Sequence, residues 1–75
     1  MNNERRKQVG KIVAKLHEAL SMLETVAEAE REAFDNMPES FQNSERGEAA
    51  STAADTLDEA RDNVQSTIDE LGNLE

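Results

Sequence analysis

The chain has 75 residues, the length of one small domain, and we therefore expect a single domain over residues 1–75. It carries 17 acidic residues against 8 lysines and arginines, and the net charge of −9 disfavours direct binding to nucleic-acid phosphates. The absence of cysteine excludes disulfides and thiol nucleophiles, and no apolar run has the roughly 20 residues that cross a bilayer.

Residues 4–35 carry the spacing of one long amphipathic helix. Their apolar side chains recur at alternating intervals of three and four residues, as at positions a and d of a heptad repeat. A second apolar row lies one residue further on and recurs every seven residues. Together the rows form a stripe wider than a two-stranded coiled coil needs, which indicates burial against more than one neighbour. The two rows contain Val9, Ile12, Leu16, Ala19, Leu23 and Val26, and Val13, Leu20, Ala27 and Phe34.

Residues 36–44 interrupt this pattern and predict a turn. Pro38 removes a main-chain donor and disfavours helix at the residue before it. Asn36 and Glu39 have the spacing of a capping box, so we expect a short helical turn to begin there. Ser44 is a good N-cap for the helix that follows. The apolar side chains expected to seal this end of the fold are Phe34, Met37 and Phe41.

Residues 45–73 repeat the spacing of three and four and predict a second long helix, with Gly72 as its stop. The apolar residues of its first half are almost all alanine, and these small side chains fit opposite the larger Phe34 and Met37. Two long helices joined by a short link form an antiparallel hairpin. Two polar residues on the expected core face, Glu30 and Thr67, either reach solvent at the edge or fix the register of an assembly.

An isolated pair of such helices would leave much of each apolar stripe in water. We therefore expect an all-α, coiled-coil-like antiparallel hairpin that assembles as a homodimeric four-helix bundle or a higher oligomer. The expected oligomer interface consists of Val9, Ile12, Val13, Leu16, Leu20, Leu23, Val26, Phe34, Leu57, Val64, Ile68 and Leu71.

Charge is divided unevenly along the chain, with a basic start and a strongly acidic remainder. In a hairpin the acidic end at Asp69, Glu70 and Glu75 lies beside the basic start, and we expect the two to pair. The second helix also carries acidic residues at heptad spacing on its outer face. This acidic surface either keeps the protein soluble or binds a basic partner. It consists of Glu48, Asp55, Asp58, Glu59, Asp62 and Asp69.

No constellation for catalysis stands out. His17 is the only histidine and falls at an outward heptad position, away from any expected nucleophile. The Glu-x-x-His pairs of di-metal bundles and the glycine-rich phosphate loops are missing. We therefore expect no enzyme activity, no metal and no cofactor.

The centre of the chain carries the motif D-N-x-P-E-S-x-Q-x-S-E-R at residues 35–46, between two acidic amphipathic helices. It resembles a set of small acidic helical proteins encoded by bacteriophages and prophages. The resemblance implies a phage setting rather than an activity. The motif itself consists of turn and capping residues, so it either builds the hairpin turn or forms a recognition tip. The residues of such a tip would be Met37, Pro38, Phe41 and Arg46.

Three hypotheses for function follow. The first is a non-enzymatic interaction protein of phage or prophage type that binds and inhibits or modulates a host protein, such as a component of a defence system. The second is an oligomeric sponge for an anionic, nucleotide-like ligand, and the third is a structural module of a larger particle. All three place the chain in the bacterial cytoplasm, without a membrane partner. The anion contacts of a sponge would be Arg5, Arg6, Lys7, Lys11 and Arg46.

Overall fold

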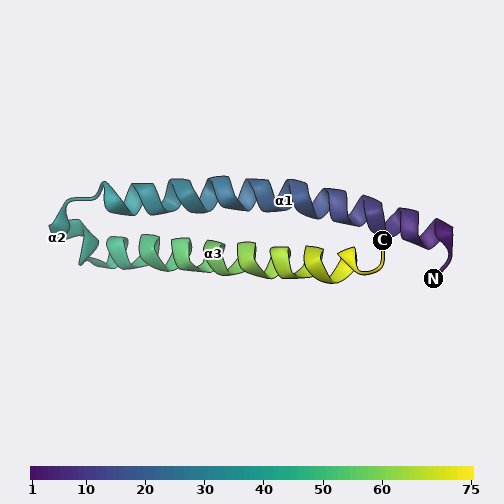
Figure 1. Cartoon of the computed structure of the whole chain (residues 1–75). Coiled ribbons are helices and arrows are strands. Elements are labelled where there is room, and N and C mark those ends of the chain that lie inside the picture. The colour runs from purple at the N-terminus through teal and green to yellow at the C-terminus, as the bar shows by residue number, and fades with distance from the viewer.

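A computed structural model describes residues 1–75 and contains three α-helices and no strand, which confirms the prediction of an all-α fold. Helix α1 covers Asn3–Asp35, α2 covers Glu39–Gln42 and α3 covers Glu45–Gly72. α1 and α3 lie side by side as a hairpin, with α2 at the turn and both chain termini at the other end (Figure 1). Neither long helix contains an apolar stretch that would reach across a bilayer.

The hairpin is a thin rod with extents of 58 × 14 × 13 Å. Its radius of gyration is 17.0 Å, whereas a compact domain of this length would have about 11 Å. The accessible surface is 5567 Å², against about 4,600 Å² for a compact monomer of this mass. A single layer of two helices therefore leaves an unusually large surface uncovered.

The core is one line of apolar side chains between α1 and α3. On α1 the row that recurs every seven residues from Val13 faces α3, and Leu20 and Ala27 follow it. Ile12 and Val26, from the neighbouring predicted row, are 48% and 50% exposed. The wide predicted stripe is therefore divided, because Val9 and Leu16 of that row join the core whereas Ile12 and Val26 lie in water. The buried core consists of Val9, Val13, Leu20, Ala27, Ala50, Ala54 and Ile68, with Leu16, Val64 and Leu71 partly buried against it.

Side-chain caps fix where the two long helices begin. The side-chain oxygen of Asn2 accepts a hydrogen bond of 2.9 Å from the main-chain N–H of Arg5, so α1 starts one residue earlier than predicted. Ser44 caps α3 as predicted, and its hydroxyl accepts from the N–H of Gly47. These contacts satisfy donors that the first turn of a helix leaves free.

The predicted capping box of Asn36 and Glu39 is wrong. Asn36 is the C-cap of α1, and its main-chain N–H donates to the oxygens of Glu32 and Phe34. Pro38 takes the N-cap position of α2, where no side chain makes a capping hydrogen bond. α1 uses Asn36 to complete its own last turn, so the residue is not free to begin the next helix.

The turn is held by contacts that reach back to both long helices. The side-chain amide of Gln42 donates to the main-chain oxygens of Phe34 at 3.1 Å and Asp35 at 3.5 Å. Gly47 is buried, and a Cβ there would overlap the main-chain oxygens of Phe41 and Gln42. Phe34 is half-buried, but Phe41 is 51% exposed, so the expectation that Phe41 seals this end is wrong. The polar atoms of the motif, rather than that ring, close the turn.

Candidate interaction surfaces

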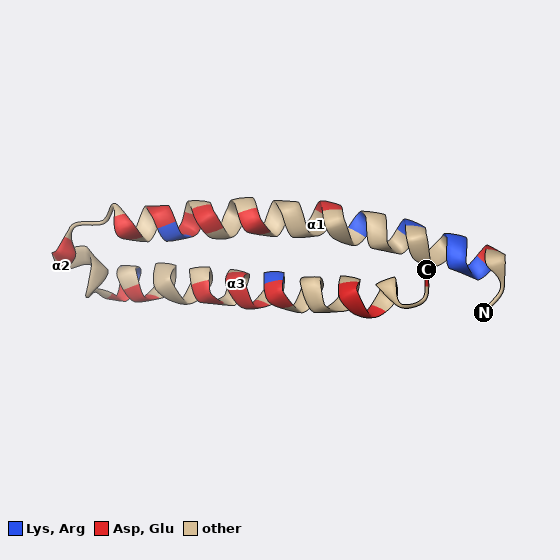
Figure 2. Ribbon diagram, in the orientation of Figure 1, with Lys and Arg blue, Asp and Glu red and all other residues tan.

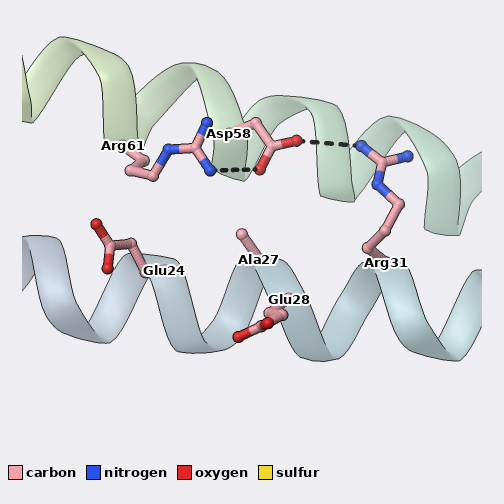
Figure 3. A pocket seen from close by; sticks show the side chains of 6 residues that line it. All are labelled: Glu24, Ala27, Glu28, Arg31, Asp58 and Arg61. Carbon is pink, nitrogen blue, oxygen red and sulfur yellow. Dashed lines mark hydrogen bonds and ion pairs between the residues drawn. The ribbon is translucent and has the colours of Figure 1, made fainter.

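The rod has two long sides that flank the seam between α1 and α3, and they differ in chemistry. One side, here called the charged side, contains a shallow depression of about 380 Å³ (Figure 3). Ala27 forms its floor, since so small a side chain leaves space between larger neighbours. The depression is lined by Glu24, Ala27, Glu28, Arg31, Asp58 and Arg61.

Asp58 joins two arginines from different helices on this side. One of its carboxylate oxygens lies 3.2 Å from Arg31 of α1, and the other lies 3.3 Å from Arg61 of α3 (Figure 3). Arg31 also pairs with Asp55 at 2.9 Å, and Arg61 with Asp62 at 3.2 Å. The hydrogen bonds from Arg31 to Asp55 and then to Asp58 raise the pKa of the Arg31 guanidinium above its ordinary value. Together these ion pairs link the two helices, and we call them the charged ladder; its residues are Arg31, Asp55, Asp58, Arg61 and Asp62.

This ladder uses half of the predicted acidic surface. Asp55, Asp58 and Asp62 make ion pairs within the chain. The other half is Glu48, Glu59 and Asp69, which make no ion pair, although Asp69 accepts a hydrogen bond of 3.1 Å from Gln65. Asp55 and Asp62 remain exposed, with side-chain exposures of 71% and 72%.

Two arginines and two glutamates of this side were not predicted as site residues. Arg31 has a half-buried side chain that reaches across the seam to α3. Glu24 and Glu28 face the same depression, so α1 adds carboxylates to the surface predicted for α3 alone. Arg61 carried a usable signal, since it lies midway between Ala54 and Ile68 in a row that recurs every seven residues and is otherwise apolar there.

The opposite side is apolar. It contains a shallow groove of about 320 Å³ lined by apolar side chains alone, with four from α1 and one from α3. Met22 is 69% exposed and Val26 is 50% exposed. We call this the apolar groove, and its residues are Ala19, Met22, Leu23, Val26 and Leu57.

The predicted oligomer interface is divided by the hairpin. Four of its residues are buried against the other helix of the same chain, namely Val9, Val13, Leu20 and Ile68. Ile12 and Val26 are exposed, and Leu23 and Leu57 line the apolar groove. Leu16, Phe34, Val64 and Leu71 are half-buried. Only part of the predicted set is therefore available to a second molecule.

The expected pairing of the basic start with the acidic end is wrong. All four ion pairs of the chain involve Arg31 or Arg61. The reason is length, because α1 has 33 residues and α3 has 28, so the start of α1 projects beyond the end of α3 (Figure 1). Glu75 lies beside Gly10. The basic overhang, which we define as residues 3–8, therefore has no helix opposite it.

The basic residues required by a ligand sponge are not gathered in one chain. Arg5, Arg6 and Lys7 lie in the basic overhang, whereas Arg46 is in the first turn of α3 at the other end of the rod (Figure 2). Around the turn, Pro38, Phe41 and Arg46 are exposed and Met37 is half-buried.

The structure contains no group of three acidic or histidine side chains arranged to hold a metal ion, and His17 is exposed. Comparison of the chain with protein families, curated proteins and solved structures returns no match in any of the three. The functional interpretation is therefore based on the charged side and the apolar groove.

Proposed function

We propose that the protein is a non-enzymatic interaction protein of phage or prophage type, which acts as a homodimer and binds a basic host protein through its charged side. The observation that carries this proposal is the continuity of the carboxylates across both helices. Glu24 and Glu28 of α1 share one side of the rod with Asp58 of α3. A basic partner would meet a broad acidic surface rather than a single helix.

The ion-pair ladder supports recognition because it positions part of this surface before binding. Arg31 and Arg61 each hold one oxygen of an exposed aspartate, Asp55 and Asp62 respectively. The second oxygen of each carboxylate makes no ion pair and remains free to accept from a lysine or arginine of a partner. Side chains held in place lose less freedom on binding than mobile ones do.

Inhibition of a nucleic-acid-binding host protein is the proposed consequence. A rigid rod with rows of carboxylates would compete with phosphates for a basic channel, and its net charge of −9 would speed encounter with such a channel. A component of a bacterial defence system that binds DNA or RNA has this chemistry. The binding would weaken with added salt, since exposed charges are screened.

Homodimerisation is supported by the small core of the single hairpin. No large side chain is fully buried, and the apolar groove is open to solvent. A chain below about 80 residues without disulfides or a metal rarely gains enough stability from one core. Covering the groove would supply the missing burial.

The test is affinity capture from a bacterial lysate with wild-type protein and two charge-matched variants. The first variant, E48Q/E59Q/D69N, removes the acidic side chains of the predicted surface that make no ion pair. The control, E4Q/E18Q/E70Q, removes three exposed charges elsewhere and has the same net charge. We expect wild-type and control to retain one defined basic protein that the first variant loses, and that about 0.5 M salt releases.

The same captured proteins with all three baits would overturn the proposal. So would a captured protein that resists high salt, because its binding would not depend on exposed charge. Activity of the captured protein, measured with and without the hairpin, then tests inhibition directly.

A further inference from the structure

Exposed and half-buried apolar side chains of α1 form a row that is self-complementary when reversed. Four of them are spaced seven residues apart, and Met22 and Leu23 lie at the midpoint of the set. The four residues are placed symmetrically about this midpoint along the helix, so a reversed copy of the row presents apolar residues at the same positions. We call these four residues the outer row; they are Ile12, Ala19, Val26 and Ala33.

Around the axis of α1, the outer row is rotated from the row that faces α3 by the angle at which a second helix would pack. Each of its residues immediately precedes one of the row that faces α3, as Ile12 precedes Val13 and Val26 precedes Ala27. Successive residues of an α-helix are about 100° apart. Helices of a four-helix bundle contact two neighbours at about this angle. α1 therefore presents one face to α3 and a second face to a helix outside the chain.

We propose that this outside helix is α1 of a second copy, running antiparallel, with the two-fold axis between Met22 and Leu23. This inference rests on the homodimer proposed above and assigns its face and its direction. Any two facing residues then have numbers that sum to 45. Ile12 faces the partner's Ala33, and Ala19 faces the partner's Val26.

Side-chain size favours the antiparallel direction. Both facing pairs of the outer row then combine a branched side chain with an alanine, so the contact has an even thickness. A parallel pair would place Ile12 on the partner's Ile12 and Ala33 on the partner's Ala33. Those layers would alternate between crowded and empty, and both conditions destabilise packing.

Charge favours the same direction. Lys15 would lie level with the partner's Glu30, and the basic overhang would lie beside the partner's acidic turn. The lysines and two of the five arginines lie in the first half of α1, whereas acidic residues outnumber basic ones along the rest of the hairpin (Figure 2). A parallel pair would bring like charges together at both ends, whereas the antiparallel pair brings opposite charges together at both ends. The overhang that finds no acidic helix within its own chain finds one in the partner.

The size of the side is sufficient for a stable dimer. A face of 58 × 14 Å has a geometric area of about 800 Å². Stable complexes bury about 800 Å² on each partner. The antiparallel overlap of the two α1 helices runs from Gly10 to Asp35, about 39 Å of the 58 Å length, and along the rest the basic overhang of each copy lies beside the partner's turn.

Cysteine cross-linking tests the direction, because the chain contains no native cysteine. A disulfide requires Cα atoms within about 4.4–6.8 Å, and residues seven apart along a helix are separated by about 10.5 Å. We expect a mixture of A19C and V26C proteins to form the mixed disulfide dimer under mild oxidation. Neither variant alone should link to itself at a comparable rate. A14C mixed with V26C is the matched control, since Ala14 is exposed outside the outer row.

Sedimentation of the reduced proteins separates two kinds of failure. A monomer at all concentrations would overturn the homodimer and this inference together. A dimer in which A19C and V26C each link to themselves would overturn the antiparallel direction alone, as would a dimer without the mixed disulfide. Capture of a host protein uses the charged side, so its outcome is independent of both results.

A charge exchange tests the register. Lys15→Glu and Glu30→Lys should each weaken dimerisation by about two- to tenfold, because each places like charges opposite one another. The double variant restores opposite charges, keeps the net charge of wild type and should restore the dimer dissociation constant. A double variant weaker than both single variants would overturn the assigned register.

Discussion

The side-chain amide nitrogen of Gln42 lies 3.1 Å from the main-chain oxygen of Phe34 and ties α2 to the end of α1. Main-chain oxygens in the last turn of a helix lack partners within that helix. The oxygen of Phe34 accepts from the main-chain N–H of Met37 at 3.1 Å, and Gln42 supplies it a further donor from the far side of the turn. A glutamine in the central motif therefore has a structural role in closing the hairpin.

Replacement of Gln42 by alanine should lower the free energy of unfolding by about 0.5–1.5 kcal/mol, the range for one lost hydrogen bond. Urea unfolding followed by circular dichroism, at matched protein concentration, measures this change. Gln65→Ala is the control, because the amide of Gln65 bonds an exposed carboxylate within α3 and its loss should change stability by less than about 0.5 kcal/mol. Equal effects of the two substitutions would show that Gln42 does not hold the turn.

Gly47→Ala should destabilise the hairpin by about 1–3 kcal/mol, as overpacking does. The added Cβ would overlap the main-chain oxygens of Phe41 and Gln42, which cannot move without opening the turn. Helix propensity alone would favour alanine, so the sign of the change is informative. Thermal unfolding of the variant measures it.

Gly10→Ala should have the opposite effect and stabilise the hairpin. A Cβ there meets only a side-chain oxygen of Glu75, at the ordinary contact distance of 3.4 Å. We expect this variant to be more stable by about 0.5–1 kcal/mol, since glycine is costly inside a helix. Stabilisation by both alanines would contradict the close approach at Gly47.

The two phenylalanines should respond differently to truncation. Phe34→Ala removes a half-buried ring and should cost about 1–3 kcal/mol. Phe41→Ala removes a ring that is 51% exposed and should change stability by less than about 0.5 kcal/mol. Guanidinium unfolding of both variants checks the difference. A larger loss of stability in Phe41→Ala than in Phe34→Ala would show that the Phe41 ring does seal the turn.

Arg31→Gln should lower the melting temperature by removing the ion pairs to Asp55 and Asp58. The folded pKa of Arg31 is raised, so its contribution is complete below the unfolded pKa and is lost only as pH rises through the folded pKa. The difference between wild type and variant should therefore stay constant from about pH 6 to pH 10. It should shrink between about 0.05 M and 1 M NaCl, because Asp55 is exposed and Arg31 and Asp58 are only half-buried, so salt screens these ion pairs. A difference that salt leaves unchanged would point to packing instead.

The spacing of apolar residues was sufficient to predict both long helices, because a helix can bury a face only at intervals of three and four. It was not sufficient to decide which row of α1 faces α3. Val13 and Ile12 belong to adjacent apolar rows, and either row satisfies the pattern. The choice depends on how the side chains of the two helices pack, and the buried Ala27 and Ala54 lie in the contact that forms.

The ladder on the charged side depends on the relative placement of two distant segments. Arg31 and Asp58 are 27 positions apart in the sequence. They meet because the turn sets where α3 lies along α1, and no local pattern encodes that register. The failed pairing of the basic start had a simpler cause, since the predicted ranges 4–35 and 45–73 already implied helices of unequal length.

Both termini lie at the end of the rod opposite α2 (Figure 1). A pulling force applied between them would load the contacts between α1 and α3 one after another, starting with those around Val9 and ending at the turn. The hairpin would thus open like a zipper, and the tight packing around Gly47 would separate last. An unfolding machine that pulls on the two ends would meet little mechanical resistance, whatever the thermodynamic stability of the fold.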